Sequence, residues 1–449
     1  MTKDSITLNS CQISKAKDLK QIVFLGYVPP VNKLKKIGSL YKEEKLYPLE
    51  LFYSNSSKLV QISTIVNKEI LFPKEYPYTS STTKILRKNF KELYDECTKI
   101  INLTNNDLII DIGSNDGNLL SNFKKKHKVL GITPEKIGHI AIKKGINTII
   151  KYFDNRTTSS VLKKFSKAKI ITATNVFAHI DNVKNVIRNI LKLLKNDGVF
   201  ISESHYLVPL IKTVQYDTIY HEHLRYYSLT SLKKLFDKFN LEIIHAKEIE
   251  PHGGSIRVYA ARKGFYKVKK SVKKILQYEK KFLNKKTFNK FNKTIVNSKV
   301  NLFSLISKIK KDNKKIYGIG APSRSSTLIN YVGLNEQIID CVLEIDGSYK
   351  IGHYIPGTKI PILNEKILYK DQPEYVILFS WHIKDELKKN LKKRGFKGKF
   401  IIPLPYPKIE NWILFFFIKK LLIKKPIDII IKGNKGIKYL DWVLGTHRP

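Results

Sequence analysis

The sequence predicts an α/β protein with two parallel-sheet domains and a small irregular lobe at its N-terminal end. Between residues 80 and 265, short apolar runs typical of buried strands alternate with amphipathic stretches, and the alternation returns between 313 and 409. The 449 residues leave room for about three domains. A hydrophobic content of 42% is enough to form their cores.

The elements follow in order along the chain. Residues 1–78 have short apolar runs broken by prolines, which indicates strands and loops. In the central domain, residues 79–265, strands are expected at Leu108–Ile112, Val129–Ile132, Ile170–Thr174 and Val199–Glu203. Residues 266–312 have apolar positions at helical spacing and predict one or two linking helices. The second α/β domain, 313–409, has expected strands at Lys315–Ile319, Ile338–Leu343 and Tyr375–Phe379, and 410–449 form a basic and apolar tail.

The net charge of +44 raises the question of a polyanionic partner. Only nine of the 82 basic residues are arginine, the residue whose planar donors match phosphates and guanine edges. A lysine-rich excess scattered over the chain favours a solvated surface over a nucleic-acid interface. A nucleic-acid methyltransferase or binding protein therefore stays only as an alternative.

Cysteine usage and hydropathy point to a cytoplasmic protein. Three distant cysteines, Cys11, Cys97 and Cys341, imply no disulfide framework, and residues 1–10 lack an apolar signal core. No apolar run reaches the ~18 residues of a membrane-spanning helix. The segment 411–425 combines aromatic residues with lysines and predicts at most a weak contact with a membrane surface or an oligomer partner.

The clearest local signal is a strand that runs into a glycine-bearing turn, Asp111–Gly117 (DIGSNDG). Gly113 and Gly117 permit a tight turn and a close backbone approach to a ligand. The dinucleotide pattern GxGxxG and the phosphate-binding loop are both absent, which favours a nucleoside ligand without phosphates. The next strand ends at Thr133 and Pro134, and Glu135 follows two residues after Thr133.

Titratable side chains follow the later strands of the central domain. His179 comes after the third strand, and Tyr220, His221, Glu222 and His223 follow the fourth. Open α/β sheets bind ligands at the carboxyl ends of their strands. A structural histidine is one alternative and a metal site is another, but HExxH is missing. Catalysis is therefore the preferred interpretation.

Six motifs together resemble the S-adenosylmethionine-dependent C-methyltransferases that act on nucleotide-linked 4-keto-deoxysugars. In chain order they are Asp111–Gly117, Asn175–His179 (NVFAH), Tyr220–His223 (YHEH), His252–Arg257 (HGGSIR), Tyr317–Pro322 (YGIGAP) and Tyr354–Thr358 (YIPGT). The resemblance covers residues 10–409. It implies a zinc lobe, a central Rossmann-like methyltransferase domain, and a C-terminal Rossmann-like domain that helps to hold the nucleotide sugar.

The resemblance also implies roles for individual residues. His223 would be the base that forms an enolate, Tyr220 and Glu222 would position or polarise the substrate, and His179 would lie near the sugar. The residues implied for S-adenosylmethionine are Asp111, Gly113, Ser114, Asn115, Asp116, Gly117, Thr133, Pro134, Asn175, Val176 and Phe177. Those implied for the substrate are Tyr76, Tyr78, Ser80, His221, Gly253, Gly254, Arg257 and Arg324, with the two arginines as contacts of its phosphates.

Two departures from the family pattern qualify this hypothesis. Thr133 stands where relatives carry an acidic residue, so a protein that binds ligand without catalysis is an alternative. Relatives carry two CxxC pairs in the lobe. In this sequence, serine occupies three of the four cysteine positions (Ser14, Ser54 and Ser57), and only Cys11 remains. Serine hydroxyls are poor zinc ligands, so we expect no structural zinc.

Overall fold

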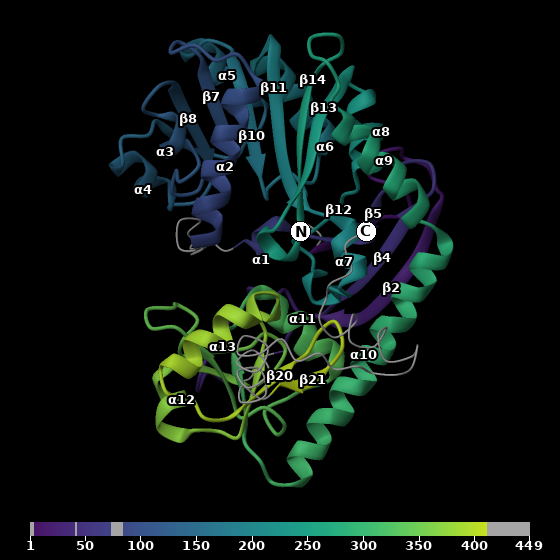
Figure 1. Ribbon diagram of the computed structural model, residues 1–449, viewed down its shortest axis with the longest axis vertical. Coiled ribbons are helices and arrows are strands. Elements are labelled where there is room, and N and C mark those ends of the chain that lie inside the picture. Colours follow the sequence, from purple (N-terminus) through teal and green to yellow (C-terminus); the bar gives the residue numbers. More distant parts are fainter. Residues whose placement is uncertain (1–3, 41–42, 73–83, 411–449) are drawn as a thin grey trace, which may run out of the picture. The chain divides into compact units, whose positions relative to one another are not determined.

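The computed structural model describes residues 4–40, 43–72 and 84–410 (Figure 1). The chain divides into two units, Met1–Lys408 and Ile409–Pro449, and the first contains the lobe and both sheet domains. The expected contacts of Tyr76, Tyr78, Ser80 and the tail segment 411–425 lie outside the described residues. Within the described ranges, no helix is long and apolar enough to cross a membrane.

The N-terminal lobe is an antiparallel sheet with strand order β12-β5-β4-β2. Its strands are β2 (Leu19–Val28), β4 (Tyr47–Ser54), β5 (Val60–Ile62) and β12 (Arg225–Tyr226). In β4 the buried residues Tyr47, Leu49 and Leu51 alternate with half-buried ones, the pattern of a sheet with one face on a core. Because β12 belongs to the central domain, the lobe is completed by a later part of the chain. The lobe also contains β1 (Ser5–Thr7), β6 (Thr64–Val66) and α1 (Lys68–Leu71).

The central domain has a seven-stranded sheet with order β13-β14-β11-β10-β7-β8-β9 (Figure 1). The strands are β7 (Leu108–Ile112), β8 (Lys128–Thr133), β9 (Thr148–Ile150), β10 (Ala168–Thr174), β11 (Leu194–His205), β13 (Leu241–Ile249) and β14 (Ser255–Arg262). The first five are parallel, and β14 runs antiparallel to both of its neighbours. The chain turns back between β7 and β10, which places a ligand crevice at their carboxyl ends.

The parallel strands of this sheet are buried throughout, because helices cover both of its faces. The covering helices are α2 (Lys84–Ile100), α3 (Leu120–Phe123), α4 (Gly138–Lys143), α5 (Asn155–Lys164), α6 (Val183–Leu193) and α8 (Leu229–Asp237). The domain also contains α7 (Leu207–Lys212) and the short 3₁₀ helices η2 (Tyr216–Thr218) and η3 (Pro251–Gly253). Side-chain caps begin several of them: Asp154 accepts from the Thr157 amide, and Asn182 from the Asn185 amide.

The linking region forms two helices, α9 (Lys270–Phe282) and α10 (Lys285–Lys311). Their apolar residues recur at helical spacing, and in α10 Phe288, Phe291 and Ile295 are buried. The amide of Asn292 on α10 donates a hydrogen bond to the Ile22 carbonyl of β2 at 2.5 Å. The long helix therefore packs on the N-terminal lobe on its way to the C-terminal domain.

The C-terminal domain is a second mostly parallel sheet. Its strands are β15 (Ile316–Ile319), β16 (Cys341–Glu344), β17 (His353–Tyr354), β18 (Pro361–Asn364), β19 (Tyr375–Leu378) and β20 (Lys399–Ile402). Its helices are α11 (Ser323–Val332), α12 (Lys366–Asp371), η4 (Trp381–Ile383) and α13 (Lys384–Lys393). The strand β21 (Lys408–Glu410) spans the boundary between the two units. Strand β15 lies between β16 and β19, so this sheet has a crevice of its own.

The lobe and the C-terminal domain share structure that the sequence did not predict. Strand β3 (Lys35–Lys36), from the lobe, pairs with β17 of the C-terminal sheet. Buried residues of the lobe, of α10 and of the C-terminal domain form one continuous apolar core, whereas the two faces of the central sheet have separate cores. Most of the lobe therefore packs with the C-terminal domain, while Cys11, Ile13 and Leu59 pack into a core of the central domain.

Candidate active site

A cavity of about 2330 Å³ lies at the carboxyl ends of the central strands. The lobe supplies Asn32 to its wall, and the C-terminal domain supplies the loops after β15, β16 and β19. Polar residues of the lobe, the central domain and the C-terminal domain therefore face a common space. Of the twenty expected site residues that the structure describes, fourteen border this cavity.

The loop after β7 forms one end of the cavity. Gly113 has φ of +76°, and a Cβ there would lie 2.2 Å from Cγ2 of Val176, so only glycine fits. The buried hydroxyl of Ser114 has no hydrogen-bond partner among the described residues, which leaves a polar atom for a ligand. Asp111 accepts a hydrogen bond from Thr172 Oγ1 at 2.6 Å, and burial raises its pKa to about 7.

Two of the expected cofactor residues in this loop do not border the cavity. Asp116 is fully buried and forms an ion pair with Lys144 at 3.0 Å. A Cβ on Gly117 would meet the side chains of Ile146 and Ala141, so this glycine allows α4 to pack closely. Both residues shape the turn, whereas Asp111, Gly113, Ser114 and Asn115 line the cavity.

The end of β8 pairs a hydroxyl with a carboxylate. Thr133 is fully buried, and its Oγ1 donates a hydrogen bond to Glu135 Oε2. Glu135 and Pro134 border the cavity, but Thr133 does not. An acidic group is therefore present at the end of β8, two residues after the expected position.

After β10, Asn175 and Val176 border the cavity, and Asn175 has a positive φ of 58°. Phe177 is different: it is fully buried, and its ring stacks on Tyr227 with 5.7 Å between centroids. This position contradicts the expected cofactor contact. Phe177 is a core residue, and only its neighbours reach the ligand space.

The expected catalytic residues gather around His223. Its ring centroid lies 4.0 Å from that of Tyr220 and 4.9 Å from that of His179. Its Nδ1 lies 2.8 Å from the carbonyl oxygen of Thr218. Because a carbonyl only accepts, Nδ1 carries the proton, and the lone pair of Nε2 is left to act as a base. Burial holds the pKa of His223 well below its usual value, so the ring is neutral at pH 7.

Glu222 connects three parts of the chain. Its Oε1 accepts a hydrogen bond from Asn32 Nδ2 at 2.6 Å, and Asn32 Oδ1 accepts one from Ser323 Oγ at 3.0 Å. Burial raises the pKa of Glu222 to about 7. No motif in the lobe pointed to Asn32, which reaches Glu222 from 190 positions away.

His221 points toward the lobe. Its Nε2 lies 3.2 Å from the Pro48 carbonyl of β4, and burial lowers its pKa to about 4. His221 borders the cavity, as expected for a substrate residue, but its hydrogen bond to Pro48 holds the lobe.

The glycines after β13 form part of the wall. A Cβ on Gly253 would lie 2.7 Å from Gln215 Oε1, and one on Gly254 would lie 2.6 Å from Pro209 Cγ, so close packing requires both glycines. Gly253 borders the cavity and Gly254 does not.

Arg257 lies away from the cavity, which contradicts the expected contact with a substrate phosphate. Its guanidinium is fully buried and bonds to Glu203 Oε1 at 2.5 Å, to Glu96 Oε2 at 2.9 Å and to Asn89 Oδ1 at 2.8 Å. The side chain therefore ties α2 to the central sheet and has no remaining access to a ligand.

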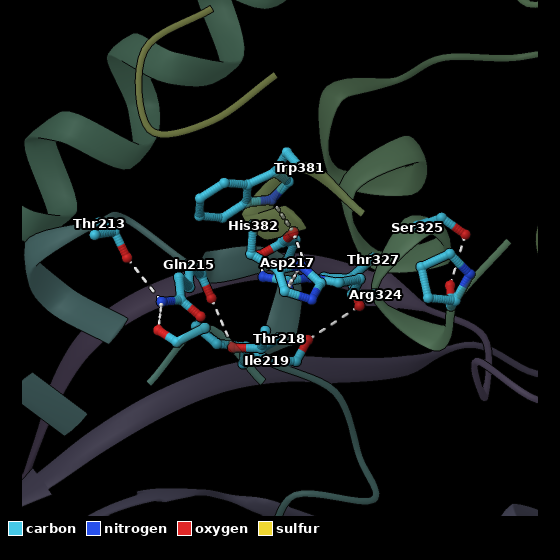
Figure 2. A network of polar contacts seen from close by, with 12 residues as sticks. Thr213, Gln215, Asp217, Thr218, Ile219, Arg324, Ser325, Thr327, Trp381 and His382 are labelled. Carbon is cyan, nitrogen blue, oxygen red and sulfur yellow. Dashed lines mark hydrogen bonds and ion pairs between the residues drawn. The ribbon is translucent and has the colours of Figure 1, made fainter. Parts of the chain in front are cut away.

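Arg324 borders the cavity, but its donors are directed at protein groups (Figure 2). Nε and Nη2 each donate to the carboxylate of Asp217 at 2.8 Å, and Nη1 lies 2.8 Å from His382 Nδ1. The expected phosphate contact would have to compete with this bidentate ion pair.

The four positions at which relatives carry cysteine come together in the lobe, with hydrogen bonds among them. Cys11 Sγ lies 3.0 Å from Ser57 Oγ, which donates to Ser54 Oγ at 3.1 Å. Ser14 Oγ accepts from Ser56 Oγ at 2.8 Å. Two zinc ligands would lie roughly 3.8 Å apart around an ion with bonds of about 2.3 Å. One thiol and three hydroxyls in direct contact do not fit a structural zinc ion.

Three family models match successive parts of the chain. They are described as "Putative zinc binding domain" for residues 11–72, "Methyltransferase domain" for 85–246 and "C-methyltransferase C-terminal domain" for 250–405. The C-methyltransferase NovU of Streptomyces niveus is 29% identical over 410 residues, which cover 90% of this chain and 97% of the relative.

The solved structures that are similar to this chain include an S-adenosylmethionine-dependent methyltransferase of Clostridium acetobutylicum. The two chains are 14% identical, the match covers 41% of this chain and 94% of that chain, and the TM-score is 0.31. Another is the magnesium protoporphyrin IX methyltransferase of Synechocystis with bound SAH, which is 12% identical. This match covers 39% of this chain and 82% of that chain, with a TM-score of 0.31. The successive family models and the near-complete alignment with a C-methyltransferase agree with the cavity at the ends of β7, β8 and β10. The chain is an S-adenosylmethionine-dependent methyltransferase, and over nearly its whole length it is similar to a C-methyltransferase.

Proposed function

We propose that this enzyme methylates a carbon next to the ketone of a nucleotide-linked 4-keto-deoxysugar, after His223 has removed a proton from that carbon. The observation that carries the proposal is the hydrogen bond from His223 Nδ1 to the Thr218 carbonyl. It leaves Nε2 unprotonated in a cavity that both sheet domains border. The relative from Streptomyces niveus, a C-methyltransferase, supports carbon as the accepting atom.

The cofactor residues fit S-adenosylmethionine. Gly113 leaves space for a close approach, the Ser114 hydroxyl has no partner among the described residues, and Glu135 supplies an acceptor for a ribose diol. When bound, S-adenosylmethionine supplies an electrophilic methyl group on a sulfonium. The chain's part is to hold this group beside the substrate and to exclude water.

Removing the proton requires a neutral base and a way to stabilise the enolate oxygen. A C–H next to a ketone is acidic because the carbanion delocalises onto that oxygen. His223 is neutral at pH 7. Glu222, with a pKa of about 7, carries a proton part of the time and then donates a hydrogen bond. The ring of Tyr220 lies against His223 and places a second hydroxyl donor at the same wall.

The nucleotide part of the substrate belongs at the C-terminal wall of the cavity. Lys350 borders the cavity there and donates to the Ala321 carbonyl at 2.5 Å, at the end of β15. Within the described ranges, Lys350 forms no ion pair with a carboxylate. A diphosphate would supply an anionic partner.

The cysteines bear on the cellular compartment. All three are free and buried, in agreement with a reducing cytoplasm.

The test is transfer of a labelled methyl group from S-adenosylmethionine to a panel of nucleoside-diphosphate 4-keto-deoxysugars. His223→Asn should lower the rate about 10²–10⁴-fold, the usual contribution of a general base. It should also abolish deuterium exchange from D₂O into the sugar carbon next to the ketone. His139→Asn changes an exposed histidine on α4 and should leave both rates unchanged.

Two results would overturn the proposal. One is normal deuterium exchange by folded His223→Asn protein, which would show that another group takes the proton. The other is a methylated product whose new methyl group is on oxygen or nitrogen, as determined by mass and NMR spectroscopy.

A further inference from the structure

The helix η2 places two consecutive residues in contact with two different domains (Figure 2). Asp217 is almost fully buried, and its carboxylate accepts three hydrogen bonds from the C-terminal domain. Two come from Nε and Nη2 of Arg324, at the start of α11, and one comes from Trp381 Nε1 in η4, each at 2.8 Å. The next residue, Thr218, contacts the catalytic cluster instead.

The main-chain carbonyl of Thr218 accepts the proton on His223 Nδ1 at 2.8 Å and also lies 3.3 Å from Tyr226 Oη. This carbonyl is the group that selects the His223 tautomer, because a neutral imidazole with Nδ1 protonated has its lone pair on Nε2. Its position depends on the backbone of η2. One residue therefore separates the ion pair with Arg324 from the acceptor that orients the base.

Other contacts hold the same short segment. Thr327 Oγ1, one helical turn along α11 from Arg324, donates to the Ile219 carbonyl at 3.1 Å. Thr218 Oγ1 donates to the Gln215 carbonyl at 2.8 Å. Residues 215–219 are thus clamped between α11 on one side and their own turn on the other, so the carbonyl of Thr218 has little freedom to move.

Each nitrogen of the Arg324 guanidinium has a protein partner. An arginine only donates, so the contact of Nη1 with His382 Nδ1 requires that nitrogen to be unprotonated. Burial and the charge of Arg324 lower the pKa of His382 to about 3, in agreement with this role as an acceptor. The guanidinium therefore has protein partners at Nε, Nη1 and Nη2.

We propose that Asp217 and Arg324 are positioning residues, which fix the Thr218 carbonyl from the C-terminal domain and so set the reactive tautomer of His223. The inference rests on the proposed function, because it assumes that His223 is the base. It assigns to Arg324 a task other than binding phosphate. It also explains why an aromatic N–H from η4 and a guanidinium from α11 meet on a single carboxylate.

The test uses the full chain labelled with ¹⁵N-histidine. In the wild type, His223 should give the NMR signature of an Nδ1-protonated, Nε2-unprotonated ring. Asp217→Asn removes the charge that binds Arg324 and should convert this signal to a mixture of tautomers. Deuterium exchange into the keto sugar should fall at least tenfold, with the KM for S-adenosylmethionine unchanged.

Two further variants separate positioning from folding. Asp107→Asn breaks another ion pair, between the buried Asp107 and the partly exposed Lys195 at 2.6 Å, and should lower the melting temperature without changing the tautomer. Trp381→Phe keeps an aromatic ring at this position, removes the hydrogen bond that Trp381 Nε1 donates to Asp217, and should fold even if Asp217→Asn does not. It should shift the tautomer and the exchange rate in the same direction by a smaller factor.

A wild-type tautomer and exchange rate in Trp381→Phe, and in any Asp217→Asn protein that folds, would overturn the inference while His223→Asn remains inactive. Normal exchange in His223→Asn would instead overturn the proposed function. The two failures are therefore distinguishable.

Discussion

We propose that Thr133 and Glu135, at the end of β8, share the ribose-binding task for which an acidic residue was expected at position 133. Thr133 is fully buried and donates its proton to Glu135, and Glu135 is the one of the two that borders the cavity. A carboxylate accepts two hydrogen bonds and suits a ribose diol better than a hydroxyl does. The departure at residue 133 therefore displaces the acidic group without removing it.

We expect Glu135→Gln to weaken the binding of S-adenosylmethionine roughly 10- to 100-fold, since a hydrogen bond to a charged group is worth about 1.5–3 kcal/mol. Thr133→Val keeps the branched shape and removes only the support for Glu135, so its effect should be smaller. Calorimetric titration measures both, with Glu92→Gln on α2 as a control. Wild-type affinity in Glu135→Gln would show that the ribose is held elsewhere.

The arginines show where residue-level prediction stops. Both Arg257 and Arg324 were expected to bind phosphate because a cation follows a glycine turn or lies near one. Their partners are Glu203, 54 residues from Arg257, and Asp217, 107 residues from Arg324. No local pattern announces such a partner, and only the folded chain shows that both guanidinium groups are already paired.

At the scale of elements, the two turns that carry Cys11 and Ser57 lie together, as the two halves of a zinc site would, but hydrogen bonds take the place of metal bonds between them. The amides of Ile13 and Ser14 donate to Cys11 Sγ at 3.3 and 3.4 Å. Burial raises the pKa of this thiol, but hydrogen bonds from Ser14, Ser54 and Ser57 together lower the pKa by more than burial raises it, so the net shift is downward. Hydrogen bonds thus join the turns that zinc would otherwise join.

We therefore expect the purified enzyme to contain no stoichiometric zinc, and its melting temperature to be unchanged by a chelator. The triple variant S14C/S54C/S57C should gain about one tightly bound zinc ion per chain, because four thiolates at these positions form a tetrahedral set. Elemental analysis checks both expectations. Adding Cys11→Ser to the triple variant is the matched control and should weaken the gained site. One zinc ion in the wild type would refute the prediction.

Across the whole molecule, histidines concentrate around the cavity and are held neutral by burial. Burial lowers the pKa of His179, His221 and His252 to about 4, and that of His205 and His382 to about 3. With His223 they make six such rings. An unfolded chain protonates its histidines near pH 6.5, so below that pH the unfolded state binds more protons and stability falls.

Carboxyl groups with a raised pKa act in the opposite direction, and among the described residues burial raises the pKa of five: Asp111, Asp181, Glu203, Glu222 and Glu279. Asp111 and Glu222, each with a pKa of about 7, take up protons in the folded state as the pH falls below 7. The six histidines outnumber them, so the melting temperature should fall as the pH is lowered from 7 to 5. Each histidine contributes a slope of up to about 1.4 kcal/mol per pH unit. His252→Asn should flatten the dependence and His139→Asn should not. A melting temperature that is constant over this range would contradict the prediction.

The sequence by itself determined the order of the elements and the edge of the sheet where the ligands bind. Apolar runs and helical spacing are local properties, and the ends of parallel strands meet at one edge, so Gly113, Asn175 and His223 were predictable as neighbours. Tertiary structure decided which groups are free to act. It brought Asn32 to Glu222 and gave the lobe a strand in the C-terminal sheet. It also joined Asp217 to Arg324 and Trp381. These contacts depend on packing between distant segments, and the local sequence carries no trace of them.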